Sequence, residues 1–391
     1  MTSLISSPGR LIAVLILCCF ALAITAPAQT FTNLGDLDGS DGAFPQQNAL
    51  IQGTDGNFYG TTLNGGAFGH GTTFGQGTVY KVTADGTVSA LYVFCSLAQC
   101  ADGAQPTSSL VLGGDGNFYG ATTGGGANNS GTFFKLTPDG TLTTLYSFCS
   151  QTNCADGDGP SGAMVMGFDG NFYGATAGNI AANRGAGTIF KITPSGVLTT
   201  LHTFCSVTNC ADGVNVRAGL VRARDGSFYG TTLEGGTTGL GTIFRFTPTG
   251  QFKTLYTFCS EANCADGESP YGPLAVGANG NVYGTVSGGG SGGLFHAGTA
   301  FQLAPDGTYT VLYNFCTVTN CLDGAVPWGG LVLATDGRLY GTTVEGGFND
   351  RGIVFRMTSG GVLTRLHSFD ATDGAAPLSA RSEERRVGKE C

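Results

Sequence analysis

A six-residue segment, Asp-Gly-Asn-Phe-Tyr-Gly, recurs through the chain and constrains its fold more than any other feature. Its copies and close variants begin at Asp55, Asp115, Asp169, Asp225, Asn279 and Asp336. Successive copies lie 60, 54, 56, 54 and 57 residues apart. A period of this length is typical of proteins built from similar units in a stack or ring. The repeat units cover about residues 46–104, 105–158, 159–214, 215–268, 269–325 and 326–376.

Each unit contains four short runs that we predict to be β-strands. In the second unit these runs are Ser109–Leu112, Phe118–Thr123, Gly131–Thr137 and Thr141–Phe148. They are rich in β-branched and aromatic residues, and Asp-Gly, Gly-rich and Pro-Asp-Gly segments separate them. Tight turns join antiparallel neighbours, so each unit predicts one four-stranded antiparallel sheet.

Some of these runs are apolar on both faces, as in Thr188–Ile192, which indicates a sheet covered on both sides. Sheets packed face to face around an axis meet this requirement. We therefore predict an all-β fold, a β-propeller of six four-stranded repeats. A β-solenoid is the alternative, but its coils are usually shorter and its strands parallel.

Three recurring segments resemble those of a known family. They are Asp-Gly-Asn-Phe-Tyr-Gly-Thr-Thr, Gly-Thr-Ile-Phe-Lys-Ile-Thr-Pro and Leu-Thr-Thr-Leu-Tyr-Ser-Phe, which together resemble the GloVer tandem repeat, the Gloeobacter/Verrucomicrobia repeat of exported bacterial proteins. Their strand-turn core is also similar to the two-component regulator propeller repeat. The resemblance implies an exported bacterial β-propeller, often anchored at the cell surface, and no activity that can be assigned to named residues. No sorting signal is visible before Arg381.

The composition excludes several classes of protein. Only 12 % of the residues are charged and the net charge is −9, so the chain repels phosphate backbones and we expect no nucleic-acid partner. The 67 glycines follow no three-residue period, which excludes collagen. With 41 % hydrophobic residues the chain can bury a large core, which argues against disorder.

The N-terminal segment differs from the repeats. It carries Arg10, an apolar run over Leu11–Ile24 and then Ala26-Pro27-Ala28, the small-x-small pattern that signal peptidase recognises. We expect residues 1–28 to be a signal peptide, which implies secretion to the outside or the cell surface. A retained membrane anchor is the alternative, although the apolar run is shorter than the ~20 residues of a spanning helix.

The C-terminal segment, Arg381–Cys391, also differs from the repeats: seven of its eleven residues are charged, whereas the N-terminal segment is mostly apolar. It resembles a vector-derived peptide, and we interpret residues 381–391 as a non-native tail. A solvated basic tail is the alternative. The propeller domain then covers residues 29–380, with no transmembrane helix after signal cleavage.

Both ends of the array contain parts of a further unit. Residues 30–45 match the end of a fourth strand with the connector that follows it, and residues 373–380 match the opening of a seventh unit. If the tail is non-native, we expect a truncated seven-bladed ring that the strand at Phe31 closes. If the tail is native, six blades must close on themselves.

Ten of the 13 cysteines form five pairs with one spacing, each in the connector between the last strand of one unit and the first strand of the next. In an exported chain this pattern predicts disulfides. A zinc site would need four ligands per loop, and a redox pair would not recur five times. The pairs are Cys95–Cys100, Cys149–Cys154, Cys205–Cys210, Cys259–Cys264 and Cys316–Cys321.

One connector position varies while its neighbours repeat. It is occupied by Gln46, Thr107, Ser161, Arg217, Tyr271, Trp328 and Leu378. Connectors and Gly-rich loops share one face of an up-and-down propeller, so we expect these residues to ring the mouth of the channel on the cystine-loop face. Arg217, Tyr271 and Trp328, the only tryptophan, could form a wall that stacks against a sugar or peptide. The alternative is that they only fill blade edges.

The remaining candidates carry weaker signals. His70 and His296 lie in Gly-rich loops on the same face and could be ligands or acids, the alternative being exposed histidines with no role. His202 and His367 replace a tyrosine of other units, which predicts core positions. The connector aspartates could bind calcium around the mouth, although each can equally form its own Asp-Gly turn. We predict no metal, no cofactor and no catalytic residue.

These features predict a monomeric, secreted or cell-surface β-propeller that binds a glycan or an extracellular protein through its cystine-loop face. The alternative is a propeller-type polysaccharide hydrolase or lyase with its site at the channel mouth. A surface array with no specific ligand is a third hypothesis.

Overall fold

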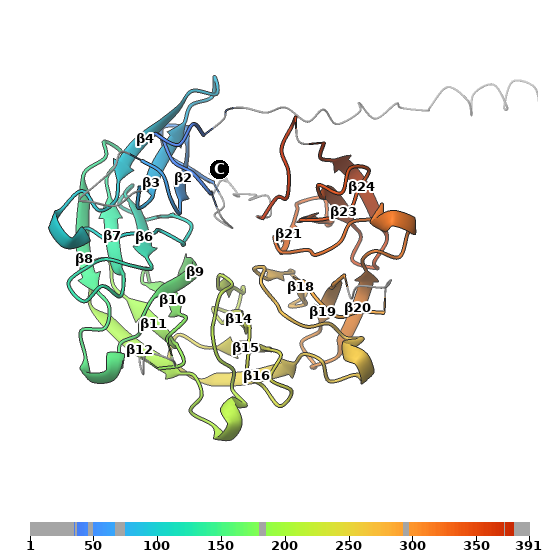
Figure 1. Ribbon diagram of the computed structural model, residues 1–391. Coiled ribbons are helices and arrows are strands. Elements are labelled where there is room, and N and C mark those ends of the chain that lie inside the picture. Colours follow the sequence, from blue (N-terminus) through green and yellow to red (C-terminus); the bar gives the residue numbers. More distant parts are fainter. Residues whose placement is uncertain are drawn as a thin grey trace, which may run out of the picture. The chain divides into compact units, whose positions relative to one another are not determined.

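Six four-stranded antiparallel sheets make up the part of the chain that the computed structural model describes: residues 35, 37–45, 50–66, 75–179, 185–291, 297–370 and 372–378. The chain divides into two units, Met1–Thr32 and Asn33–Cys391, and every described residue belongs to the second. The sheets stand in a ring, with the fourth strands at its outside (Figure 1). This confirms the predicted six-repeat β-propeller.

The strands of each blade follow one another in chain order. Blade 1 consists of β1 (Ile51–Gln52), β2 (Phe58–Thr62), β3 (Thr78–Val82) and β4 (Val88–Val93). Blade 2 consists of β5 (Val111–Leu112), β6 (Phe118–Thr122), β7 (Thr132–Leu136) and β8 (Leu142–Ser147). Blade 3 consists of β9 (Pro160–Met166), β10 (Phe172–Thr176), β11 (Thr188–Ile192) and β12 (Leu198–Thr203).

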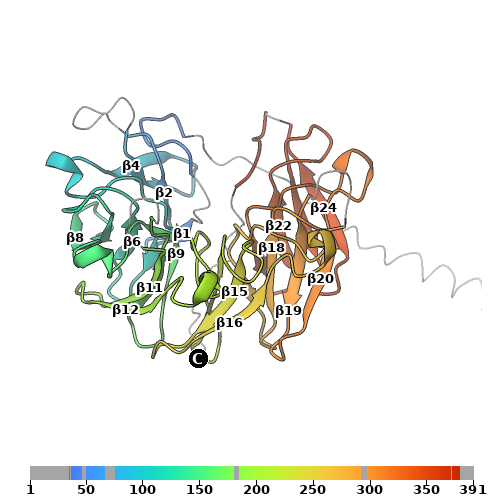
Figure 2. The same ribbon diagram turned by 60° about the horizontal axis from the view of Figure 1, so that its bottom comes forward.

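The second half of the ring repeats this order, and Figure 2 shows its blades beside the first three. Blade 4 consists of β13 (Val221–Arg222), β14 (Phe228–Thr232), β15 (Thr242–Phe246) and β16 (Phe252–Thr257). Blade 5 consists of β17 (Ala275–Val276), β18 (Val282–Val286), β19 (Thr299–Leu303) and β20 (Tyr309–Asn314). Blade 6 consists of β21 (Leu331–Leu333), β22 (Leu339–Thr343), β23 (Ile353–Met357) and β24 (Leu363–Ser368).

The recurring segment forms the turn between the first two strands of a blade and packs that blade onto the next. In blade 2, the carboxylate of Asp115 accepts hydrogen bonds from the backbone N–H of Asn117 at 3.2 Å and from Tyr119 Oη at 2.9 Å. The ring of Tyr119 then lies 4.4 Å from that of Phe172 in blade 3. Five hydrophobic clusters of this kind join successive blades, from blades 1 and 2 to blades 5 and 6. The repeated residues therefore serve both the turn and the blade junction.

Short 3-10 turns lie within the cystine loops, at the outer rim of the ring (Figure 1). They are η1 (Ala98–Cys100), η2 (Thr152–Cys154), η4 (Thr208–Cys210), η5 (Ala262–Cys264) and η6 (Thr319–Cys321). The five predicted cysteine pairs are joined by disulfides in the structure. The loops therefore reinforce the outer edge, and none of their cysteines reaches the centre.

The connector aspartates are buried within these loops rather than exposed at the channel mouth. Asp156 accepts hydrogen bonds from Tyr146 Oη at 2.7 Å, from Ser150 N and Oγ at 2.8 Å, and from Gln151 N at 3.1 Å. Burial alone would raise the pKa of the Asp156 carboxyl, but these hydrogen bonds outweigh it and hold the pKa below its usual range. Burial, aided by the negative Asp156, raises the pKa of Tyr146 to about 12.

The same arrangement recurs at most of the other junctions. The equivalent carboxylates belong to Asp102, Asp212, Asp266 and Asp323, whose exposed fractions are all 5 % or less. A calcium ring built from these aspartates is therefore wrong, because their oxygens are enclosed by their own loops.

The terminal predictions fall mostly outside the described residues. These include the signal peptide, the strand at Phe31 and the tail at 381–391. Residues 372–378 contain no strand, but Ala376 N donates to Arg351 O at 2.9 Å, as connector residues do at earlier junctions. The seventh blade stays a prediction. Within the described part of the chain, no helix has the length and apolar character needed to cross a membrane.

A buried pair of threonines joins the second and third strands in four blades. In blade 2, Thr122 Oγ1 and Thr132 Oγ1 lie 2.9 Å apart, and Thr122 also donates to the carbonyl of Gly124 at 2.9 Å. Blade 5 has Val286 at the first of these positions. The hydroxyl of Thr299, opposite it, is buried and has no hydrogen-bond partner. A buried unpaired hydroxyl destabilises the folded state.

We predict that Val286→Thr stabilises the protein by about 1 kcal/mol, because the new hydroxyl is isosteric, accepts from Thr299 and can donate to the carbonyl of Gly288. A thermal melt followed by circular dichroism measures the change as a rise in Tm. Val282→Thr on the same strand is the control: Val282 belongs to the same apolar cluster but lies opposite Leu303, so the new hydroxyl has no partner there and should lower Tm. A lower Tm for Val286→Thr would contradict the prediction.

His202 stands where most blades have a tyrosine, and its protonation couples stability to pH. Its Nε2 lies 3.1 Å from Asp212 Oδ2, and its ring stacks on Phe252 at 3.8 Å. Burial lowers the pKa of His202 below its ordinary value and outweighs the raising effect of Asp212. The unfolded chain therefore binds a proton more readily than the folded one, so stability falls as pH drops through about 6.5 toward the folded-state pKa.

We predict that His202→Tyr removes part of the loss of stability between pH 7.5 and 5.5, because a tyrosine stays neutral there. Urea denaturation of both proteins at the two pH values measures this difference. The reverse exchange in blade 2, Tyr146→His, should add a comparable loss. If the free energy of unfolding depended on pH equally in the wild type and in His202→Tyr, His202 would not be the source of the pH dependence.

Candidate functional site

One connector residue hydrogen-bonds two successive blades together and thereby places the variable position. Between blades 1 and 2 this residue is Gln105: its N–H donates to Gln76 O at 2.7 Å, and its carbonyl accepts from Thr123 N at 3.0 Å. The equivalent residues at the next junctions are Gly159, Asn215, Ser269 and Val326. We call these the bridging residues. All have a positive φ, between 57° and 62°, which turns the chain toward the ring centre.

The variable residue comes two positions after each bridging residue, and in most connectors a proline stands between them. Five of the seven variable residues line a single cavity of about 390 Å³, which we call the axial pocket. Its lining residues are Thr107, Thr123, Ser161, Gly162, Ala177, Arg217, Leu233, Tyr271 and Trp328. They come from five successive blades, and five blades of a ring meet only near its axis. The structure therefore brings Arg217, Tyr271 and Trp328 together.

The aromatic side of the axial pocket consists of two half-buried rings. The centroids of Tyr271 and Trp328 lie 5.3 Å apart, and the ring planes are tilted by 32°. Glycines let their two connectors approach: a Cβ on Gly272 would lie only 2.3 Å from Gly330 N. Any larger residue at position 272 would force these backbones, and with them the two rings, apart.

The threonine and serine hydroxyl groups of the pocket already donate to the protein. Thr107 and Thr123 bond to each other and to the carbonyl of Pro160, which Thr123 Oγ1 approaches to 3.1 Å. Ser161 Oγ donates to the carbonyl of Val216. These three oxygens can still accept hydrogen bonds from a ligand, but their protons are engaged.

Arg217 provides the charge of the pocket and is exposed. Its Nε donates to Asn215 Oδ1 at 2.9 Å, and Asn215 Nδ2 donates to Glu234 Oε1 at 3.1 Å at the rim. The two terminal nitrogens of Arg217 form no hydrogen bond or ion pair within the described residues. Among the lining residues there is no Asp, Glu or His.

The other predicted site residues are not among the described residues that line this pocket. His70, His296 and the variable residue Gln46 lie outside the described part of the chain, and Leu378 does not line the cavity. The cystine loops also stay away from it, at the outer rim. The inner halves of the connectors line the cavity, while their cystine loops lie farther out; recognition through the cystine-loop face stays a prediction.

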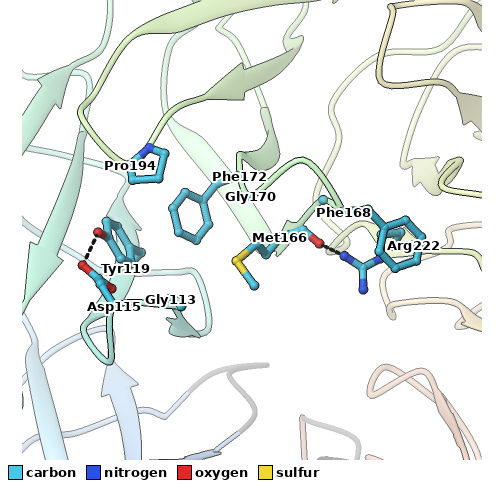
Figure 3. Close-up of a pocket in the computed structure, with 11 residues that line it drawn as sticks. Gly113, Asp115, Tyr119, Met166, Phe168, Gly170, Phe172, Pro194 and Arg222 are labelled. Atoms are coloured by element: carbon cyan, nitrogen blue, oxygen red, sulfur yellow. Dashed lines mark hydrogen bonds between the residues drawn. The ribbon is translucent and has the colours of Figure 1, made fainter. Parts of the chain in front are cut away.

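A second cavity, of about 530 Å³, lies among the tight turns of blades 2 to 4 (Figure 3). We call it the turn-face pocket. Phe168, which is 70 % exposed, stands at its edge, and the Arg222 guanidinium lies 3.9 Å from the centre of the Phe168 ring. Arg222 also donates to the carbonyl of Met166. The sequence analysis did not single out these two residues. The signal was present, because the positions of Phe168 and Arg222 carry other residue types in the other repeats.

The polar groups of the turn-face pocket are bound to one another. Tyr119 Oη donates to Asp115, and burial together with this negative partner raises the pKa of Tyr119 to about 12. Burial of Asp115 opposes, but does not overcome, the hydrogen bonds from Asn117 and Tyr119 that lower its pKa. This pocket therefore offers an apolar surface with few unused polar groups.

No arrangement for metal binding stands out among the described residues. The one group of potential ligands there is Cys259, Cys264 and Glu268, and its two sulfurs are joined in a disulfide. Disulfide sulfurs are not thiolates, so this group does not fit a metal site.

Solved structures with a similar fold include two from Bacteroides. A candidate 6-phosphogluconolactonase of B. uniformis aligns with a TM-score of 0.51 and 15 % identity over 87 % of this chain and 89 % of its own. The extracellular domain of a candidate hybrid two-component system of B. thetaiotaomicron aligns with a TM-score of 0.54 and 12 % identity over 90 % of this chain and 36 % of its own. At these identities the similarity concerns the fold alone.

No curated protein matches the sequence significantly. The profile of the Gloeobacter/Verrucomicrobia repeat matches residues 71–295 and 205–386, which together span more than half of the chain. These segments include five of the six copies of the recurring turn segment, those that begin at Asp115, Asp169, Asp225, Asn279 and Asp336. The chain belongs to the Gloeobacter/Verrucomicrobia repeat family.

Proposed function

We propose that this propeller is an exported carbohydrate-binding protein and that its ligand occupies the axial pocket. The observation that supports this most directly is the convergence of five variable connector residues on one cavity. The ring geometry brings these equivalent positions together, and connectors on a rigid framework commonly carry binding residues. Arg217, Tyr271 and Trp328 form no hydrogen bond to a neighbouring blade among the described residues, so their side chains are available to a ligand.

The chemistry of the pocket suits a sugar. Pyranose rings present C–H groups that stack on aromatic faces, and Tyr271 and Trp328 offer two such faces at an angle. The hydroxyl oxygens of Thr107, Thr123 and Ser161 can accept hydrogen bonds from sugar hydroxyls. A volume of about 390 Å³ lies within the range of small-ligand sites.

Binding fits the described pocket better than hydrolysis or elimination does. Glycoside hydrolysis needs two carboxyl groups on either side of the scissile bond, and the described lining has neither Asp nor Glu. The five disulfides support an oxidising location, in keeping with the predicted signal peptide. We therefore propose a ligand-binding role outside the cytoplasm without catalysis.

We predict that the full chain, expressed in an oxidising compartment, binds at least one member of a broad glycan array in a saturable manner. Trp328→Ala should weaken that binding about 30-fold, because truncating an aromatic anchor typically costs at least about 2 kcal/mol. Isothermal titration calorimetry with the captured glycan measures both affinities, because Trp328→Ala removes the only tryptophan and with it a fluorescence signal.

Phe168→Ala is the matched control, since it removes an exposed aromatic ring from the turn-face pocket and should leave binding unchanged. Circular dichroism verifies that each variant is folded. Failure of the folded wild type to bind any glycan would contradict the proposal. Loss of binding in Phe168→Ala but not in Trp328→Ala would assign the ligand to the other cavity.

A further inference from the structure

We infer that the axial pocket selects acidic sugars, with Arg217 binding a carboxylate. This inference rests on the proposed function and narrows its ligand class. It follows from the hydrogen-bonding groups of the pocket: the protons of its threonine and serine hydroxyls are engaged, whereas the terminal N–H groups of Arg217 are not.

The donors that remain unengaged are few and lie close to the aromatic wall. Three hydroxyl protons of the pocket, those of Thr107, Thr123 and Ser161, are bonded to protein oxygens. The terminal nitrogens of Arg217, Tyr271 Oη and Trp328 Nε1 have no hydrogen-bond partner among the described residues. The pocket thus presents a guanidinium and two neutral donors to whatever enters it.

An ionised carboxylate on a sugar accepts hydrogen bonds, donates none and carries a charge opposite to that of a guanidinium. Its two oxygens match the two terminal nitrogens of a guanidinium, which can hold them in a bidentate pair. Because the Nε of Arg217 is tied to Asn215, the side chain is anchored while its far edge stays available. A neutral sugar would leave this charged edge without an equivalent partner.

The nearest acid acts against this preference but does not cancel it. Glu234 is bonded to Asn215, not to Arg217, and it is exposed at the rim. The net charge of the chain, −9, repels anions at long range, yet salt at 0.15 M screens charges beyond about 8 Å. The short-range ion pair between Arg217 and a bound carboxylate therefore determines which sugars bind tightly.

The test uses the full chain and matched pairs of oligosaccharides: oligomers of galacturonate, glucuronate and mannuronate, each beside its neutral methyl ester. Binding is followed by Trp328 fluorescence at 0.15 M salt. We expect at least one acid form to bind roughly 10- to 100-fold more tightly than its ester. Arg217→Gln should abolish this difference while leaving the affinity for the ester nearly unchanged. Arg217→Lys should retain only part of it, because an ammonium is a point charge.

Glu234→Gln serves as the opposing variant, since loss of the rim charge should strengthen binding of the acid form and not of the ester. Quenching of Trp328 by iodide, compared with neutral acrylamide, provides a measurement without ligand. Arg217→Gln should lower the iodide quenching alone, because the cation no longer attracts the anion toward the ring.

The outcomes separate this inference from the proposed function. Binding of esters or other neutral glycans only, lost in Trp328→Ala, would overturn the acidic preference and leave carbohydrate binding intact. An acid preference that persists in Arg217→Gln would also overturn it. Binding of no glycan at all, or of a poly-glutamate peptide instead, would contradict both.

Discussion

The ring depends on one backbone interaction, the pair of hydrogen bonds by which each bridging residue joins two successive blades. Gln105, for example, donates to blade 1 and accepts from blade 2, at 2.7 and 3.0 Å. These bonds use only main-chain atoms, so they place few demands on the side chain, and the position is filled by Gly159 at one junction and Val326 at another. The positive φ shared by these residues turns every connector inward, and the variable residue follows two positions later.

Most of the fold could be predicted from the sequence, because the same turn and strand residues recur in six repeat units. Turn residues such as Asp115 and strand residues such as Phe118 and Tyr119 recur with their spacing, and the copies in the first three blades make the same Tyr–Asp hydrogen bond and the same ring contact with the next blade. The convergence of Arg217, Tyr271 and Trp328 was predictable for a related reason: when similar blades stand around one axis, equivalent positions lie at similar distances from it.

The parts that were not predictable depend on which side chains meet in space, which the spacing of residue types alone does not show. Nothing in the Asp-Gly pattern shows that Asp156 is enclosed by its own cystine loop and Tyr146, so a calcium ring remained an open hypothesis. The cystine loops lie at the outer rim because each connector stays at the outside of the ring after the fourth strand before it turns inward (Figure 1). The turn-face pocket depends on the packing of Arg222 over Phe168, which belong to different blades.

A framework held by backbone bonds and repeated aromatic contacts leaves its axial residues free to change. Trp328 and Arg217 make few contacts that the blades need, so substitutions there alter recognition at little cost in stability. The turn-face pocket differs, since Tyr119 and Phe172 in its wall also form a blade junction. Its shape is therefore tied to folding. Thr107 and Ser161 also bond to carbonyls at the next blade junction, whereas Arg217, Tyr271 and Trp328 do not. These three positions around the axis give the propeller a site whose charge and shape can be set without redesigning the ring, and this makes the axis the natural place for ligand specificity.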